Sequence, residues 1–417
     1  MSDQSKSGVS RRDVLKAGAA AGVAGVFGPY VKVARADDTV KVGVLEPQTG
    51  TYAALGQNEI NGAKMAAKQL NAKNGILGRE VALHIEDTAA DVGTAVQKTN
   101  KLIDRDNVSF CMGAVSSAVA LAISQAAEQK GKTYMVTGGH TDSVTGSNCR
   151  WNTFRICTTT WMLAAGVAKT LADKFGKRWY FITPDYAFGH TEQAAFAKLN
   201  KQLGGEVLGN ALAPLGTTDF SSYLIKAKSA KPDVLIVLQA GNDLVNCLKQ
   251  AAEFGMADEM AIAGGLMELE VLKALPDAAR FGWWTFEWWW DQPGVPHVQD
   301  FVAQYRKEYG DYPTARSWFG FAGLHSMALG AEKAGSLDSM KLARGLEGLQ
   351  LPPEVALEPH NPTIRAGDHQ LLADAFPGQV NSSGSYPNLF DVARTVPGES
   401  IALSVDQDEC KMSYPSS

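Results

Sequence analysis

The stretch Phe110-Cys111-Met112-Gly113-Ala114-Val115-Ser116-Ser117-Ala118 has the pattern of a buried strand that passes through a turn of small residues into a helix. In an open parallel sheet, ligands bind outside the carboxyl ends of the strands. Ser116 and Ser117 would then lie at a helix N-terminus, where free N–H groups and the helix dipole favour an anion such as a carboxylate. Serine here also suits simple N-capping, so both interpretations stand at this point.

Short β-rich runs alternate with amphipathic stretches on both sides of this segment. The first series predicts strands at 40–45, 81–85, 108–112 and 133–136 and helices at 57–72, 92–105 and 117–130. A second series of similar size predicts helices at 161–175, 190–203, 220–229 and 244–254 and strands at 179–182, 206–212, 234–238 and 260–263. This alternation predicts an α/β fold of two lobes, each with a parallel sheet covered by helices.

Beyond these two series the pattern is less regular. Helices are expected at 298–309, 317–334 and 340–346, and the tail from 352 onward is expected to supply loops and edge strands that cross back between the lobes. Five of the nine Trp fall in one aromatic-rich segment, at 283, 284, 288, 289 and 290. We expect most of these rings to pack in the core and hinge, with Trp288 or Trp290 at the edge of a cleft as the alternative.

The composition is that of an ordinary globular protein, with 417 residues, 45% hydrophobic residues and a net charge of −5. That charge gives no support for nucleic-acid binding, which normally requires a basic face. The first 36 residues differ, because Arg11-Arg12 precedes an uncharged Ala/Gly-rich run and Ala34-Arg35-Ala36 offers a peptidase site. This segment resembles a twin-arginine export signal and predicts a periplasmic protein. Removing its six basic and two acidic residues from the chain's 39 and 44 leaves 33 and 42, a net charge of −9.

The five cysteines are an odd number, so at least one thiol should stay free in an oxidising compartment. Cys149 and Cys410 lie in loop-like sequence and are the pair that we expect to bridge.

Signatures of catalysis are weak in this sequence. Gly131-Lys132-Thr133 ends like a phosphate loop but lacks the first glycine and leads into a strand. The seven His show no metal-ligand spacing, and Ser116 lacks the flanking glycines of a nucleophile elbow. We therefore expect no catalytic residue, no metal and no cofactor, although a triad assembled from distant residues stays as an alternative.

Two further strand ends carry groups suited to a ligand. The strand at 133–136 leads into Gly138-Gly139-His140-Thr141-Asp142, which ends in hydroxyl and backbone donors and can converge with Ser116 and Ser117. His140 suits a solvated loop equally well. The strand at 179–182 opens into Pro184-Asp185-Tyr186-Ala187-Phe188-Gly189, whose rings could cover an apolar ligand or plug the core of their own lobe.

A larger set of motifs is distributed along the chain. In order they are Leu45-Glu46-Pro47-Gln48-Thr49-Gly50, Tyr52, Gly56, Asn61-Gly62-Ala63, 71–78, Asp87-Thr88, Ser116-Ser117, 139–142, 185–189, Asp219-Phe220-Ser221 and 305–313. In combination they resemble the leucine/isoleucine/valine-type periplasmic solute-binding proteins of ABC transporters. The resemblance implies two Rossmann-like lobes of the type I periplasmic-binding-protein fold, joined by a hinge of three crossovers. We expect the export signal at 1–36, the first lobe at 37–158 and 285–350, the second lobe at 159–284, and a C-terminal crossover and tail at 351–417.

The resemblance also implies roles for particular residues. Ser116, Ser117 and Thr141 would receive a ligand carboxylate, and Gly139 or His140 would offer backbone groups. The walls would be formed by Tyr52 and Leu55 from the first lobe and by Tyr186, Phe188 and Met267 from the second.

One departure from the family bears on the ligand. The amino-acid binders of this family hold the α-ammonium with an acidic residue after the strand at 260–263, where this chain has Gly264-Gly265-Leu266-Met267. That counter-ion is missing unless Glu268 replaces it, and an unpaired buried ammonium is costly. The expected function is capture of a small carboxylate, with an aromatic acid as the favoured class, for an ABC permease complex in the membrane. We expect a monomer that binds no nucleic acid. Branched-chain amino acids or amides, a sensor that feeds a receptor, and an enzyme remain as alternatives.

Overall fold

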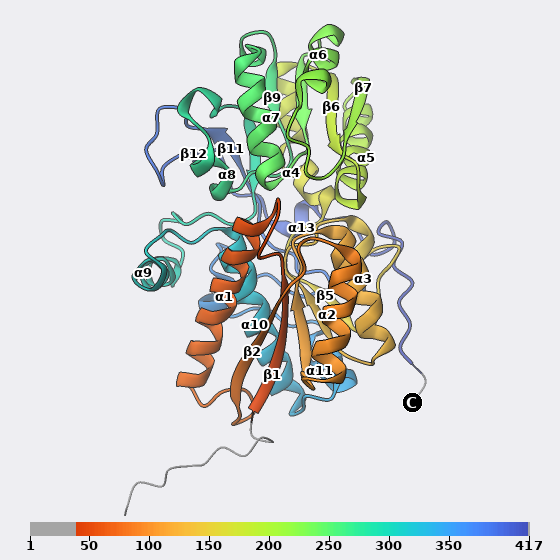
Figure 1. Ribbon diagram of the computed structural model, residues 1–417, viewed down its shortest axis with the longest axis vertical. Coiled ribbons are helices and arrows are strands. Elements are labelled where there is room, and N and C mark those ends of the chain that lie inside the picture. Colours follow the sequence, from red (N-terminus) through yellow and green to blue (C-terminus); the bar gives the residue numbers. More distant parts are fainter. Residues whose placement is uncertain (1–38, 416–417) are drawn as a thin grey trace, which may run out of the picture. The chain divides into compact units, whose positions relative to one another are not determined.

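The computed structural model describes residues 39–415, so the expected export signal lies outside the described residues. Figure 1 shows two α/β lobes, each built round its own sheet. The first sheet has five parallel strands in the order β2-β1-β3-β4-β5. Their bounds are Thr39–Glu46 (β1), Glu80–Asp87 (β2), Phe110–Gly113 (β3), Tyr134–Val136 (β4) and Thr153–Arg155 (β5).

The second sheet has seven strands in the order β12-β11-β10-β9-β8-β6-β7. These strands are Arg178–Pro184 (β6), Glu206–Ala213 (β7), Val234–Val237 (β8), Ala261–Ala263 (β9), Trp283–Phe286 (β10), Phe376–Val380 (β11) and Phe390–Val392 (β12). The strands β6 to β10 are parallel and repeat the order of the first sheet, whereas β11 and β12 from the C-terminal part add antiparallel strands. The predicted two-lobed α/β fold is therefore confirmed.

Helices cover both faces of each sheet because side chains along a buried strand point alternately to either face. In the first lobe, one face packs on α1 and α10 and the other on α2 and α3. In the second lobe, one face packs on α6, α7 and α8 and the other on α4 and α5. The bounds of these helices are Ala53–Ala72 (α1), Val92–Asp104 (α2), Ser117–Gln129 (α3), Thr160–Phe175 (α4), Ala187–Gln202 (α5), Ser221–Ala230 (α6), Gly241–Glu253 (α7), Leu269–Ala274 (α8) and Ala315–Ala334 (α10).

The remaining helical segments are Asp142–Val144 (η2), Met256–Asp258 (η3), Asp277–Ala279 (η4), Val298–Tyr309 (α9), Ser339–Leu346 (α11), Pro353–Ala356 (α12) and Gly398–Ile401 (α13). The prediction placed the start of α1 at residue 57, four residues too late, because the apolar periodicity begins only inside the helix. It also missed β5, which is too short to show an alternation of its own.

The helices α1 and α10 cross at very short range because each has a glycine at the contact. A Cβ atom on Gly62 would lie 1.9 Å from the carbonyl oxygen of Ser317, and one on Gly320 would lie 1.9 Å from that of Glu59. At α10 the N-cap Thr314 and Ser317 form a reciprocal capping box. These features fix the first turn of α10, which carries Arg316, beside Glu59 of α1.

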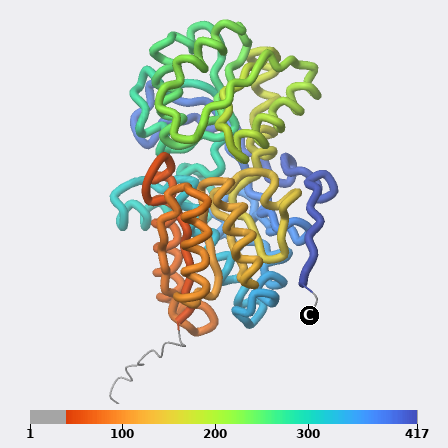
Figure 2. Tube along the Cα trace, turned by 45° about the vertical axis from the view of Figure 1, so that its right-hand side comes forward, coloured from red at the N-terminus to blue at the C-terminus, as the bar shows by residue number. Residues whose placement is uncertain are grey.

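The chain passes between the two lobes after β5, after β10 and before β11, the three crossovers expected of the hinge, and it returns to the first lobe in a fourth passage after β12. Past α13 the C-terminal segment returns along the first lobe (Figure 2). Cys149 and Cys410 form a disulfide bond there, which confirms the predicted pair, and the thiols of Cys111, Cys157 and Cys247 are free and buried. None of the helices in the described range 39–415 is both long and apolar enough to cross a membrane.

Candidate functional site

A small cavity lies where the strand ends of the two lobes meet, and each lobe contributes four residues to its wall. The first lobe supplies Tyr52, Val115, His140 and Arg316, and the second supplies Tyr186, Phe188, Ala240 and Leu266. Seven of the eight follow the carboxyl ends of β1, β3, β4, β6, β8 and β9, as expected for a ligand site of parallel sheets. The cavity has a volume of about 10 Å³, which is room for a single water molecule. Any larger ligand requires the two walls to move apart.

The two tyrosines join the walls directly. The hydroxyl oxygens of Tyr52 and Tyr186 lie 2.6 Å apart, and either can be the donor. Burial raises the pKa of both hydroxyls well above the ordinary value, so both are neutral. The pair is therefore a neutral hydrogen bond between the lobes.

His140 is held by a carboxylate from the segment that leaves the second lobe after β10. Its Nε2 lies 2.6 Å from Oε2 of Glu287, whose Oε1 accepts hydrogen bonds from the backbone N–H and the hydroxyl of Thr158. Burial by itself would raise the pKa of Glu287, but His140 and Thr158 hold that pKa below its ordinary value. An ionised carboxylate only accepts, so Nε2 carries the proton of this hydrogen bond.

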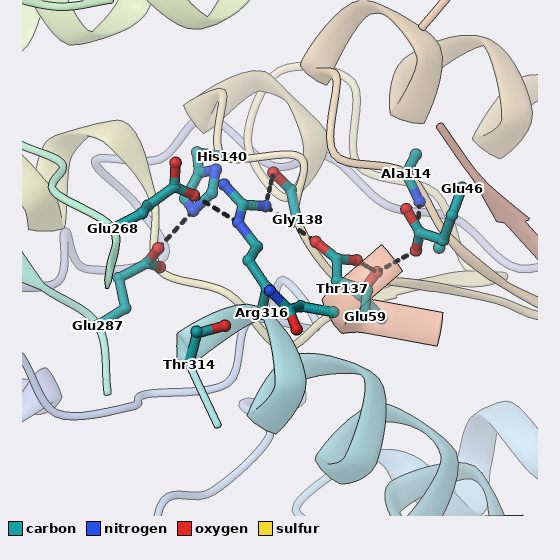
Figure 3. Close-up of polar contacts among 12 residues, drawn as sticks. Glu46, Glu59, Ala114, Thr137, Gly138, His140, Glu268, Glu287, Thr314 and Arg316 are labelled. Atoms are coloured by element: carbon teal, nitrogen blue, oxygen red, sulfur yellow. Dashed lines mark hydrogen bonds and ion pairs between the residues drawn. The ribbon is translucent and has the colours of Figure 1, made fainter. Parts of the chain in front are cut away.

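Arg316 is the cation of the cavity wall, and its partners come from both lobes (Figure 3). Its Nε donates to Oε1 of Glu268 in the second lobe at 2.6 Å, and its Nη1 donates to Oε1 of Glu59 in the first lobe at 2.9 Å. All three side chains are at most 2% exposed. Although burial lowers the pKa of an arginine, the two glutamates raise the pKa of Arg316 above its ordinary value. The guanidinium is therefore a permanent positive charge in the wall.

The cluster round Arg316 extends deeper into the first lobe. The hydroxyl of Thr137 contacts both Glu59 and Glu46 (Figure 3). It donates to Glu59, and its oxygen lies 3.0 Å from Oε1 of Glu46. Burial and the nearby Glu59 raise the pKa of Glu46 well above its ordinary value, which favours its neutral form. Of the three glutamates of this cluster, Glu59 and Glu268 are the two that pair with the guanidinium.

Four of the predicted site residues line the cavity: Tyr52, His140, Tyr186 and Phe188. Leu55 belongs to the apolar cluster behind this wall. Met267 instead packs in the core of the second lobe, and its neighbour Leu266 lines the cavity, because adjacent residues of an extended segment point to opposite sides.

The two predicted donor-rich turns, at Ser116-Ser117 and at 139–141, do lie together, but a hydrogen bond joins them to each other. The backbone N–H of Thr141 donates to the hydroxyl of Ser117 at 3.1 Å. The guanidinium of Arg155 donates to the carbonyl oxygens of Gly139 and Thr141 at 3.2 and 2.6 Å. Ser116 is the N-cap of α3, and its side chain makes no capping bond. None of these four residues of the turns lines the cavity, so their assignment to a ligand carboxylate stays a prediction.

Arg316 is a residue of the cavity wall that the sequence patterns did not single out. It fell at the boundary of a predicted helix, and its partners Glu268 and Glu59 are 48 and 257 residues away in the chain. One signal was present, because a cation in the first turn of a helix opposes the helix dipole and implies an acidic partner. The candidate counter-ion Glu268 does reach the site, and its Oε2 has no hydrogen-bond partner within residues 39–415.

The tryptophan segment lies in the cores and not at the cavity. Trp284 is buried in the core of the second lobe, and Trp288 is buried in that of the first, where its Nε1 donates to the carbonyl oxygen of Leu357. Trp290 is half-buried and packs against Tyr312. The expectation of core packing is confirmed, and the alternative that Trp288 or Trp290 lines the cavity is not supported.

Comparisons with known proteins agree on the fold. A family model described as a periplasmic binding protein matches residues 39–385. A Leu/Ile/Val-binding protein homolog 7 of Brucella suis is 27% identical over 338 residues, covering 76% of this chain and 83% of the relative. The crystal structure of a periplasmic binding protein from Burkholderia mallei has a TM-score of 0.84 and 28% identity, covering 90% of this chain and 99% of the other.

A third similar protein was solved with a ligand. It is a solute-binding protein of an ABC transporter from Rhodopseudomonas palustris in complex with 3,4-dihydroxybenzoic acid. Its TM-score is 0.79 at 24% identity, and the match covers 87% of this chain and 98% of that chain. At this identity the likeness supports the fold alone.

Proposed function

Because the chain belongs to the periplasmic binding protein family, we propose that it is the substrate-binding component of an ABC importer and captures a small aromatic carboxylate. The observation that carries the proposal is the wall of the cavity, where the guanidinium of Arg316 stands among the rings of Tyr52, Tyr186 and Phe188. A guanidinium binds a carboxylate through charge-assisted hydrogen bonds, and aromatic rings pack on a ring-shaped ligand.

Binding would proceed by a population shift between open and closed lobes. Each lobe supplies half of the wall, so a ligand that contacts both halves stabilises the closed arrangement. An incoming carboxylate competes with Glu268 for Arg316, and an incoming ring parts Tyr52 from Tyr186. The closed form would then be presented to the ABC permease complex. Export by the twin-arginine signal, a periplasmic location and a monomeric state belong to the same proposal.

A branched-chain amino acid or amide is the second candidate, and one observation favours it. Glu268 places a buried carboxylate beside Arg316 of the cavity wall, and its Oε2, unpartnered within the described residues, can receive an ammonium group. The sequence-based argument from a missing counter-ion is weakened accordingly. Arg316 opposes this candidate, because its positive charge lies 2.6 Å from the same carboxylate and repels an ammonium.

Titration calorimetry and thermal unfolding with benzoate, 4-hydroxybenzoate, cinnamate and leucine test the proposal. We expect the aromatic acids to bind and to raise the unfolding midpoint without turnover, because a ligand that binds only the folded state stabilises it. Tight leucine binding with no response to any aromatic acid would contradict the aromatic class. Mass spectrometry of a ligand that copurifies with the exported protein provides an independent identification.

A further inference from the structure

Glu192 of α5 carries a buried carboxyl group that makes no hydrogen bond within the described residues. Its side chain is fully buried, and neither carboxyl oxygen has a hydrogen-bond partner within residues 39–415. Buried polar groups are nearly always hydrogen-bonded, because a buried group without a partner loses its hydration and gains nothing in return. A carboxyl group with two unpartnered oxygens therefore requires an explanation.

Its surroundings favour the neutral form of this carboxyl group. Burial raises the pKa of Glu192 well above its ordinary value, and the nearby carboxyl groups of Asp142 and Glu287 raise it further. A neutral carboxylic acid offers one O–H donor as well as acceptor oxygens. The partner that suits it best is a group that donates and accepts at once, such as a hydroxyl group.

Glu192 lies directly behind the second-lobe wall of the cavity. Phe188 precedes it by four residues and so lies on the same face of α5. Oε1 of Glu192 lies against Gly265, where a Cβ atom would be only 2.0 Å away, and the next residue is Leu266. Both Phe188 and Leu266 line the cavity. The hydroxyl of Tyr186, which also lines it, lies near the side chains of both Arg316 and Glu192.

Arg316 lines the first-lobe wall of the cavity, and Glu192 lies behind Phe188 and Leu266 of the second-lobe wall. A ligand whose carboxylate binds Arg316 and whose other end displaces the ring of Phe188 would reach Glu192 with that end. An α-amino acid carries its ammonium next to the carboxylate, on the side of Arg316 and Glu268. Leucine, isoleucine and valine end in methyl groups and would leave Glu192 without a partner.

We propose that Glu192 receives a hydroxyl group at the far end of the ligand, and that the ligand is a hydroxylated aromatic carboxylate. This inference rests on the proposed function, because it requires a carboxylate at Arg316. It also requires the ring of Phe188 to turn aside as the ligand enters. Gly265 contributes the space that the carboxyl group occupies.

The test compares 4-hydroxybenzoate with benzoate, which differ only in the hydroxyl group, by titration calorimetry on the full chain. We expect the wild-type protein to bind 4-hydroxybenzoate about tenfold more tightly, the increment of one buried hydrogen bond. Glu192→Gln, which keeps a donor and an acceptor, should retain most of this preference. Glu192→Leu should bring the affinity ratio close to one while benzoate binding persists.

Glu358→Leu is the matched control. Glu358 is also buried, has one oxygen without a partner in the described part of the chain and carries a raised pKa, but neither it nor any residue within four positions of it lines the cavity. This variant should keep the wild-type preference, and thermal unfolding reports whether each variant is folded. The inference is overturned if a folded Glu192→Leu variant keeps the wild-type ratio of affinities for 4-hydroxybenzoate and benzoate. It is also overturned if the wild type binds both acids equally. Neither result affects the proposed function.

If the wild type binds neither aromatic acid, the proposed function is contradicted. The affinity for tyrosine is then compared with the affinity for phenylalanine in place of the two aromatic acids. A preference for tyrosine that Glu192→Leu removes supports the hydroxyl subsite and transfers it to an amino-acid ligand. Absence of any such preference overturns the subsite together with the proposed ligand class.

Discussion

Nε of Arg316 donates a hydrogen bond to Oε1 of Glu268 at 2.6 Å, and this buried ion pair joins the first turn of α10 in one lobe to the start of α8 in the other. Glu59 pairs with the same guanidinium from within the first lobe. When the lobes separate, Arg316 can keep Glu59 but loses Glu268. The ion pair is therefore part of the free energy of closure, and a ligand carboxylate competes for it.

Replacement of Glu268 by Gln should change the affinities for the two ligand classes in opposite directions. It removes a competitor of the carboxylate at Arg316, so we expect the affinity for an aromatic acid to rise several-fold. It also removes the partner of an ammonium, so the affinity for leucine should fall about tenfold or more. Titration calorimetry with both ligands measures the two signs, and a fall in aromatic-acid affinity would refute competition at Arg316.

Arg316→Gln should abolish carboxylate binding and destabilise the fold. The change leaves Glu59 and Glu268 buried without their cation, which costs about 3 kcal/mol or more of unfolding free energy. Denaturant unfolding and calorimetry measure the two effects. Arg365→Gln serves as the control, because Arg365 pairs with Asp368 away from the cavity and should leave binding unchanged.

The hydroxyl pair of Tyr52 and Tyr186 should contribute to closure as a coupled unit. We expect each Phe variant to change ligand affinity by up to about tenfold, since a neutral hydrogen bond contributes about 1 kcal/mol. The double variant should resemble either single variant, because the second substitution has no bond left to break. Strictly additive effects in this double-mutant cycle would show that the contact does not contribute to closure.

Removal of the Cys149–Cys410 disulfide should destabilise the protein without exposing other thiols. The bridge links residues 261 positions apart, and its loss as the double Ser variant should cost about 2–4 kcal/mol of unfolding free energy. The three remaining cysteines are buried, and burial raises their thiol pKa values. Thiol titration should therefore find none of the three reactive in the native protein and all three after denaturation; rapid native labelling would contradict the buried assignment.

Stability should decrease from weakly acidic to neutral pH. Burial and the nearby Glu268 raise the pKa of Glu270 to about 7 from its ordinary 4.5. Between these values the folded protein binds more protons than the unfolded chain, so the unfolding free energy falls as the pH rises, on the order of 1 kcal/mol per pH unit. Asp243 and Asp408, with pKa values raised to about 6 and about 7, act in the same direction.

Glu270→Gln isolates the contribution of Glu270 to this pH dependence. Oε1 of Glu270 accepts hydrogen bonds from Asn58 and Thr314, and a glutamine oxygen can accept both. The variant should therefore show a flatter decline of unfolding free energy between pH 4.5 and 7 than the wild type, measured by urea unfolding at a series of pH values. An unchanged slope would show that Glu270 does not titrate in this range.

Most of the architecture could be predicted from the sequence because it depends on local patterns. Apolar periodicity within about ten to twenty residues identifies strands and helices, and their alternation predicts two lobes with parallel sheets. The same patterns placed the cavity, since Tyr52, His140, Tyr186 and Phe188 all follow predicted strand ends. The family resemblance was also evident at this level and is confirmed by the comparisons.

Local sequence patterns were enough to identify the fold class, the end of the sheets at which the cavity lies and the cysteines that pair. Which charges meet there depends on the folded arrangement, because Arg316 acquires its partners through the close crossing of α1 and α10 and the contact between lobes. The same packing makes Leu266 and not Met267 face the cavity, and leaves Glu192 without a partner among residues 39–415. Hydrogen bonds and ion pairs depend on distances of a few ångströms between residues far apart in the chain, and no local periodicity encodes those distances.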